Sequence, residues 1–233
     1  IVRSLALFDV SKLMLRVARA ERAKNAVERR LNFDTETGLP NERKTLEVLM
    51  DELSGQGENA GGHPVGVALV DMMDFRQIVD IHGAATGARV ARELAETLAA
   101  HLPAGQHLAR TKEHEFAVVF PEVASKKELV SIAERLSHVS SIAVATGLGD
   151  CRVQTLLAIA EMRPGDGTAD GLLNNARIAM GFRGLPRRPG QIRIYEPEMR
   201  AALEARSRTY TELYAAIDND EIEPFFQPQV RLD

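Results

Sequence analysis

Two places in the sequence combine residue types that could do chemistry. Asp71 ends a continuous apolar run over 65–70, and the segment Lys112–Glu115 lies between two short runs typical of strands. In the fold expected for this pattern, the end of the first strand and the tip of the hairpin lie side by side. A carboxylate pair there could hold Mg²⁺ against a nucleoside triphosphate. Acidic residues at such positions are also often simply solvated, and the pattern alone leaves both interpretations open.

The elements that must position these residues follow from the hydrophobic pattern. The run over 65–70 predicts a buried strand, and the runs over 106–111 and 115–120 predict a β-hairpin. Helical spacing and short apolar runs predict the remaining elements: helices over 75–81, 88–102, 125–137, 170–182 and 197–218, and strands over 156–160 and 191–195. This βαββαβ order predicts an α+β fold, with a mainly antiparallel sheet and helices on one face.

Two helices carry further local signals. After the break at Gly38 and Pro40, a helix is predicted with one apolar face, formed by Leu46, Leu49, Met50 and Leu53. In the helix over 125–137, Ser125 followed by Glu128 predicts a capping box, in which each side chain accepts a hydrogen bond from a free backbone N–H.

Composition excludes several classes of protein. The chain has 233 residues, with 29 Lys and Arg against 33 Asp and Glu, so a general nucleic-acid partner is not expected. One cysteine, Cys151, allows neither a disulfide framework nor a cysteine-based zinc site. No apolar run is long enough to insert in a membrane and no signal peptide is recognised, so a cytoplasmic location is expected, with tethering of the parent protein to the inner membrane left open. Because the chain starts at Ile1, we expect it to be a piece of a longer protein.

The first segment predicts a long helix of the coiled-coil type. Apolar residues recur at alternating steps of three and four, with Lys24 as the one polar member and charged residues between them. This seam predicts a homodimer, although an amphipathic helix packed on its own domain is the alternative. The seam residues are Val10, Leu13, Val17, Ala20, Val27 and Leu31.

The region from about Phe33 to Glu196 resembles a GGDEF domain, the diguanylate cyclase module of bacterial signalling. Matching stretches occur in the family's order along the chain: Asp34, Thr37–Asn41, Val70–Asp80, Gly83 and Gly87, Arg110 with Glu115 and Phe116, Leu172–Met180, and Tyr195. The resemblance implies the ferredoxin-like βαββαβ palm fold of nucleotide cyclases, with an antiparallel central sheet flanked by helices.

The tail is similar to a second family. Residues 213–233, with Ala216-Ile217 and Phe226–Val230, resemble the opening of an EAL domain, the cyclic di-GMP phosphodiesterase barrel. The barrel itself is not in this chain. We therefore expect a signalling and dimerisation helix over 1–31, a GGDEF domain over 32–197, and a linker helix with the first EAL residues over 198–233.

Departures from the family pattern bear on catalysis. The signature positions read Lys112, Glu113, His114, Glu115 and Phe116, so both hairpin glycines that let phosphates approach are missing. A turn with positive φ would cost a residue with a side chain about 1 kcal/mol. His114 occupies the position at which the family has a metal-binding acidic residue, and imidazole is a poor ligand for Mg²⁺. Asp71 remains as a weak remnant of the metal site, and manganese or zinc binding through His114 and Asp71 is the alternative.

Other family sites are replaced as well. Val79 and Ala88 stand where the family has its guanine-reading Asn and Asp, and each lost polar contact removes about 1–3 kcal/mol. Pro103 and Gln106 stand at the product-inhibition site, whose charged groups are absent. Glu42, directly after the matching stretch Thr37–Asn41 that we call the entrance motif, stands where the family has an Arg. A basic cluster, Arg183 with Arg187 and Arg188, is interpreted as a solvated loop, with a phosphate site as the alternative.

These observations predict a GGDEF fold without catalysis and without a cofactor. The expected role is regulatory: the module dimerises through its first helix and relays a signal from an upstream sensor domain to a downstream EAL domain. The alternative is a GTP-sensing domain that activates an EAL phosphodiesterase, with GTP and Mg²⁺ bound only if the pocket still functions. An active diguanylate cyclase is the third interpretation.

Overall fold

The computed structural model describes residues 19, 21–24, 26–55, 62–138, 141–146 and 149–225. The chain divides into two compact units, Ile1–Tyr195 and Glu196–Asp233, and each is described by itself. Within the described residues, none of the helices has both the length and the apolar character that crossing a bilayer requires.

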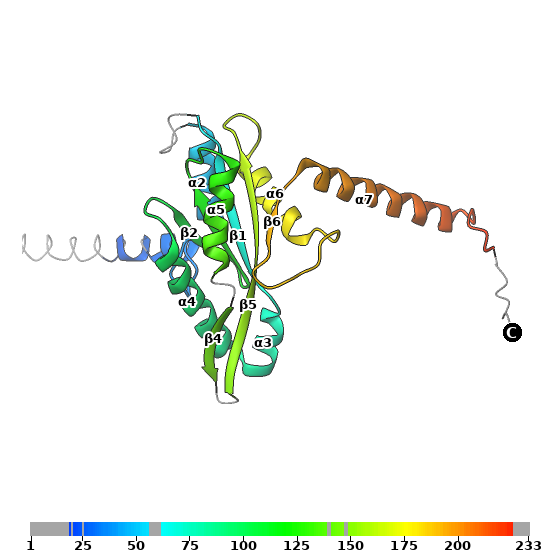
Figure 1. The fold of residues 1–233 in the computed structure, drawn as a ribbon. Coiled ribbons are helices and arrows are strands. Elements are labelled where there is room, and N and C mark those ends of the chain that lie inside the picture. The colour runs from blue at the N-terminus through cyan, green and yellow to red at the C-terminus, as the bar shows by residue number, and fades with distance from the viewer. Residues whose placement is uncertain are drawn as a thin grey trace, which may run out of the picture. The chain divides into compact units, whose positions relative to one another are not determined.

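A six-stranded sheet forms the centre of the first unit (Figure 1). Five strands lie in the order β2-β3-β1-β5-β4, all paired antiparallel, and β6 pairs in parallel with β5. The strands are β1 (Val65–Met72), β2 (His107–Lys112), β3 (Glu115–Phe120), β4 (Ser141–Thr146), β5 (Gly149–Met162) and β6 (Ile192–Ile194). The adjacency of β1 to both β3 and β5 confirms the expected βαββαβ palm core.

Helices cover both faces of this sheet rather than one, which corrects the expectation from element order. The helices are α2 (Glu42–Leu53), α3 (Phe75–His82), α4 (Ala84–His101), α5 (Lys126–Ser137), α6 (Ala169–Gly181) and α7 (Pro197–Asp218). Alternate β1 residues such as Val70 join one core with α3, α4 and α5, whereas α2 and α6 contact the sheet from the other side. Side chains of a strand alternate between the two faces of the sheet. Because helices cover both faces, every residue of β1 is buried.

The strand pair β4–β5 was only partly predicted from the apolar pattern. β4 was not predicted, and β5 begins seven residues before the predicted strand at 156–160. The β4–β5 ladder extends beyond the covered part of the sheet, where only alternate residues such as Val144 and Val153 are buried. Cys151 lies in this ladder with 7% of its surface exposed, and so belongs to the core rather than to a loop.

Two local helix predictions need correction. Met50 is 60% exposed, and the buried face of α2 is completed instead by Thr45 and Glu52 beside Leu49 and Leu53. At the start of α5, Ser125 accepts a hydrogen bond from the N–H of Glu128 as expected. The Glu128 carboxylate accepts one from the N–H of Ala124 rather than of Ser125, so the capping box is displaced by one residue.

Only part of the first helix lies within the described residues. Residues 26–32 are helical, and Val27 and Leu31 are 56% and 50% exposed. The other predicted apolar seam residues, Val10, Leu13, Val17 and Ala20, lie outside the described residues. The helix ends where Phe33 forms a bridge with Pro40, which closes the entrance loop that carries Asp34.

Candidate functional site

The strand end and the hairpin tip lie side by side, as expected. β1 pairs antiparallel with β3 in a register that places Asp71 opposite Glu115. Both carboxylates are buried, with 7% and 5% of their residue surfaces exposed. Two adjacent negative charges removed from water require positive charge nearby, and the source of that charge decides what the site can do.

The hairpin turns without glycine and without strain. Glu113 and His114 connect the paired residues Lys112 and Glu115, and neither has positive φ, because only Asp74 and Asp220 do so among described residues other than glycine. The register shifts between Arg110 and Lys112, which leaves one extra residue in β2. Such a bulge increases local twist and lets a tight turn close with ordinary backbone angles. The predicted cost of a left-handed turn is therefore wrong.

Asp71 is held by an arginine from a distant loop. The Arg187 guanidinium donates a hydrogen bond to Oδ2 of Asp71 at 2.6 Å. His114 Nε2 lies 3.7 Å from Oδ1, close enough for an ion pair only when the ring is protonated. Burial raises the pKa of Asp71 above its ordinary value, and the neighbouring Glu115 adds to this, although Arg187 and His114 act in the opposite direction.

Glu115 is held by an arginine from α6. Arg177 donates to Oε1 of Glu115 from Nη2 at 2.7 Å and from Nε at 3.1 Å, and the Thr111 hydroxyl donates to the same oxygen at 2.7 Å. Burial alone would raise the pKa of Glu115, but the hydrogen bonds from Arg177 and Thr111 outweigh it, and the pKa is lowered. Both oxygens of this carboxylate lie within hydrogen-bond distance of one guanidinium.

The same arginine also binds the residue that departs from the entrance motif. Nη1 of Arg177 donates to Glu42 at 2.7 Å, so Arg177 bridges Glu42 and Glu115. Burial alone would lower the pKa of Arg177, but its two carboxylate partners raise it instead. The acidic residue at position 42 therefore contributes to the same charge network as the hairpin.

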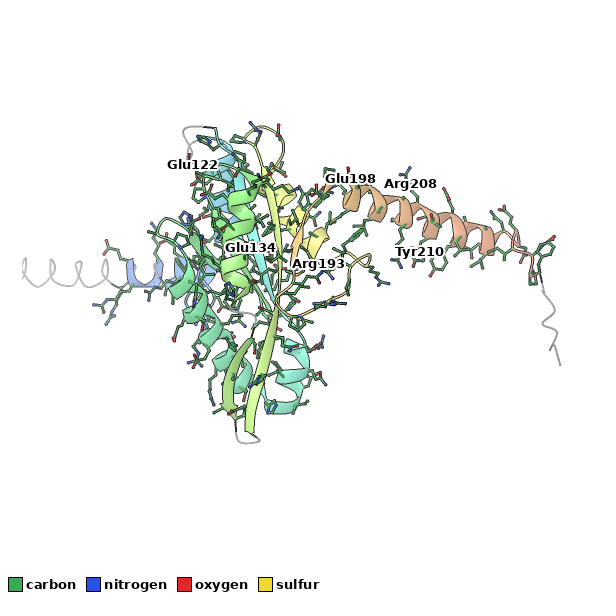
Figure 2. The ribbon with its side chains drawn as sticks, in the orientation of Figure 1. Glu122, Glu134, Arg193, Glu198, Arg208 and Tyr210 are labelled. Atoms are coloured by element: carbon green, nitrogen blue, oxygen red, sulfur yellow. The ribbon has the colours of Figure 1, made fainter. Side chains whose placement is uncertain are left out.

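The loop that carries Arg187 is fastened by a buried arginine in β6. Arg193, labelled in Figure 2, is 1% exposed and donates hydrogen bonds to backbone carbonyls of the preceding segment. The accepting carbonyls are those of Ala179, Met180, Phe182, Leu185 and Pro186. Burial lowers the pKa of Arg193, and Arg187 adds a smaller effect in the same direction. The interpretation of the basic cluster as merely solvated is therefore wrong for Arg187, which this clamp helps to place beside Asp71.

A cavity of about 380 Å³ lies beside the hairpin, and the predicted base-reading positions meet in it. Val79 of α3 and Ala88 of α4 both line it and present no hydrogen-bonding group. The two helices approach closely at Gly87, where a Cβ would lie 2.7 Å from Cγ2 of Val79. The charged groups on the lining include Asp34, Glu36, Arg110, Lys112 and Glu113.

Arg110 forms a second charge cluster at this cavity. Its Nη1 donates to Asp34 at 3.1 Å and also to Glu36, and its Nη2 donates to the Glu113 carbonyl at 2.7 Å. Burial alone would raise the pKa of Asp34, but hydrogen bonds from Thr37 and Arg110 lower it. The entrance loop is thus tied to the hairpin by ion pairs.

The predicted inhibitory-site positions lie apart from this cluster. Pro103 and Gln106 are on the connection between α4 and β2, and neither lines the cavity. Phe116 follows Glu115 in β3 and is fully buried in the core.

The residues present do not fit the divalent metal ions that the fold family implies. No group of three or more His, Cys, Asp or Glu residues that could hold a metal occurs among the described residues. Asp71 and Glu115 remain, but each already accepts hydrogen bonds from a guanidinium, and His114 offers nitrogen rather than the oxygen that Mg²⁺ prefers. The site is an ion-pair network, and no metal-dependent step is derived from it.

Sequence reasoning missed the arginines that complete this network. Apart from Asp170, Arg177 is the one charged residue of α6. A lone charge on a mostly apolar helix could have indicated a buried ion pair. Arg187 gave no such signal, because its partner Asp71 lies 116 positions away in the chain.

The comparisons with known proteins agree with this fold. The family described as diguanylate cyclase, GGDEF domain, matches residues 31–182. The GGDEF domain of YfiN from Pseudomonas aeruginosa superimposes with a TM-score of 0.62 and 25% identity, over 74% of this chain and 99% of that one. This likeness confirms the palm fold.

Two curated relatives come from whole signalling proteins. The cyclic di-GMP phosphodiesterase PdeR of Escherichia coli is 25% identical over 92% of this chain and 32% of its own length. The response regulator PleD of Caulobacter vibrioides is 33% identical over 61% of this chain and 32% of its own length. The chain spans about a third of the length of each.

We predict that Arg177 is essential to the stability of the fold. Arg177→Met leaves Glu115 buried without its guanidinium partner, which should lower the free energy of unfolding by about 3 kcal/mol in urea denaturation. The matched control is Arg43→Met, because Arg43 forms an exposed pair with Glu47, 3.1 Å away, and should change the free energy by about 0.5 kcal/mol or less. Equal effects of the two substitutions would contradict the role assigned to the network.

We also predict opposite pH dependence at the two carboxylates. Folding lowers the pKa of Glu115, so its stabilising contribution is present above the ordinary value of 4.5 and is lost as the pH falls through the folded-state pKa. Folding raises the pKa of Asp71, so its contribution is present below the ordinary value of 3.8 and is lost as the pH rises through the folded-state pKa.

The measurement is urea denaturation of wild type, Glu115→Gln and Asp71→Asn at acid and at neutral pH. The advantage of wild type over Glu115→Gln should grow as the pH rises, and its advantage over Asp71→Asn should shrink. The same direction of change in both comparisons would refute the assignment of the two pKa shifts.

Proposed function

This chain belongs to the GGDEF family of diguanylate cyclase domains, and from that premise we propose that it is a catalytically inactive, regulatory module of cyclic di-GMP signalling. One observation carries the proposal. The two adjacent carboxylates at the strand end and hairpin receive their positive charge from Arg187 and Arg177. In the family, the corresponding place binds metal ions that assist attack on the α-phosphate of GTP.

A guanidinium cannot replace a metal ion in that chemistry. A bound metal bridges phosphate oxygens through open coordination positions, whereas an arginine already engaged with a carboxylate has only its remaining N–H groups to offer. Arg177 uses its donors on Glu115 and Glu42, which leaves little for a triphosphate. The same ion pairs that stabilise the folded chain thus remove the reactive centre.

Base recognition is weakened at the neighbouring cavity. Val79 and Ala88 line it with apolar groups, so the hydrogen-bonding edge of a guanine would lose water there without gaining a partner from these positions. Glu113 adds a carboxylate to the lining of the same cavity, and its negative charge disfavours a triphosphate at short range.

The regulatory part of the proposal concerns both ends of the chain. The module receives a signal through the first helix and passes it to a downstream EAL phosphodiesterase domain. The support is the seam over 10–31, the EAL-like residues over 213–233, and the similarity to PdeR, a cyclic di-GMP phosphodiesterase. Residues 226–233 of that tail lie outside the described residues.

We expect no cyclic di-GMP when the purified chain is incubated with GTP and Mg²⁺, and the measurement is chromatography with mass detection. The Asp71→Ala variant is the matched control for contaminating activity. Product made by the wild type and lost in Asp71→Ala would overturn the proposal and establish a cyclase.

A second function is favoured by the cavity itself. The space beside Val79 and Ala88 persists at about 380 Å³, and Arg110 and Lys112 line it. In this second reading the domain senses GTP and activates the EAL domain. Calorimetric titration with GTP separates the two functions, since the scaffold role requires no heat of binding and the sensor role requires micromolar affinity that falls on substitution of Lys112.

The first helix gives a separate test of the relay. If its seam holds a homodimer, Val17→Asp combined with Leu31→Asp places charges in the seam and should weaken dimerisation measured by sedimentation. Ala18→Asp combined with Ala26→Asp is the charge-matched control, because these residues lie outside the seam. An unchanged dissociation constant of the dimer in the seam variant would exclude this mode of association.

A further inference from the structure

The helix α7 presents an apolar surface that nothing in its own unit covers. It runs for 22 residues, and no residue in it is buried. The large hydrophobic side chains Leu203, Tyr210, Leu213 and Ile217 are 54%, 47%, 45% and 51% exposed. Contiguous exposed apolar surface of this kind marks an interaction site.

The spacing of these residues is that of a helix that pairs with another helix. Steps of four and three alternate along one face, which gives the 3.5-residue period of a coiled-coil seam. The seam residues are Met199, Leu203, Arg206, Tyr210, Leu213 and Ile217. Figure 2 shows Arg208, which is not in the seam, and Tyr210, which is, projecting from opposite sides of α7.

The residues beside the seam allow two identical helices to approach. Ala202, Ser207, Thr209 and Ala216 occupy most of the flanking positions and carry no charge. The charged residues Glu204, Arg208 and Glu212 fall on the outer face. Two copies would therefore meet without rows of like charges along their edges.

The one polar residue of the seam decides the direction of pairing. Arg206 donates a hydrogen bond to the hydroxyl of Tyr210 at 2.8 Å, and its guanidinium carbon lies 5.3 Å from the centre of the ring. In a parallel pair, Arg206 would face Arg206 of the partner subunit, and the two charges would repel inside the seam. In an antiparallel pair, Arg206 faces the partner's Tyr210, which can accept its charge by a cation–π contact.

The antiparallel register also places the other seam residues opposite apolar partners, and each such facing pair is one layer of the seam. With Arg206 opposite the partner's Tyr210, Leu203 lies opposite the partner's Leu213. Met199 then lies opposite the partner's Ile217, so every remaining layer joins two apolar side chains. We propose that α7 is a self-association helix that pairs antiparallel with α7 of a second copy of this chain through this seam.

Disulfide trapping tests the pairing and its direction in the whole chain. In a Cys151→Ala background, which removes the one native thiol, Leu203→Cys with Leu213→Cys should give a covalent dimer on oxidation, because facing positions bring their Cβ atoms close. Leu203→Cys alone should remain monomeric on a non-reducing gel. The matched control is Ala201→Cys with Ala215→Cys, which spans the same axial levels on the outer face and should not cross-link.

The possible results separate the alternatives. A covalent dimer from Leu203→Cys alone would indicate parallel pairing and overturn the proposed direction. No cross-link in the double variant, or equal cross-linking in the outer-face control, would overturn the proposal as a whole. These results concern α7 alone and do not depend on whether the GGDEF site binds GTP.

Sedimentation separates this contact from that of the first helix. In the background of Val17→Asp with Leu31→Asp, the chain should still dimerise with rising concentration. Adding Leu213→Glu should weaken that dimer at least about tenfold, whereas adding Ala215→Glu on the outer face should not. A background variant that stays monomeric at every concentration would refute self-association through α7.

Discussion

The structure depends on the need to balance two buried negative charges that lie side by side. β1 and β3 place Asp71 opposite Glu115, and both carboxylates are almost excluded from water. An unpaired charge in that position would cost several kcal/mol, so the chain must supply a cation from elsewhere. It does so with Arg177 from α6 and Arg187 from the following loop, and these contacts join the last part of the domain to β3 and β1.

This constraint explains why elements outside the site are arranged as they are. Arg193 satisfies the carbonyls at the end of α6 and in the loop after it, and so fixes the backbone that leads to Arg187. Glu42 at the start of α2 takes the remaining donor of Arg177. The site and the packing of α2, α6 and β6 are therefore parts of one electrostatic arrangement.

The sequence allowed the core of the fold to be predicted, but not the charge pairs. Apolar periodicity located β1, the hairpin and the helices within a few residues, because burial dictates residue type there. The pattern failed at β4 and the first half of β5, where the ladder leaves the core and only alternate residues are covered. The partners of Asp71 and Glu115 lie 116 and 62 positions away, and no local pattern connects residues across such intervals.

The hairpin without glycine has a consequence for the unfolded chain. Lys112 and Glu113 stand where the family keeps a glycine pair, and the bulge before them lets both adopt negative φ. Glycine has more conformations to lose on folding, so each replacement at a compatible position favours the native state by about 0.4–1 kcal/mol. Lys112 and Glu113 therefore stabilise the hairpin through the smaller number of conformations open to them in the unfolded chain, an effect that no contact in the folded structure reveals.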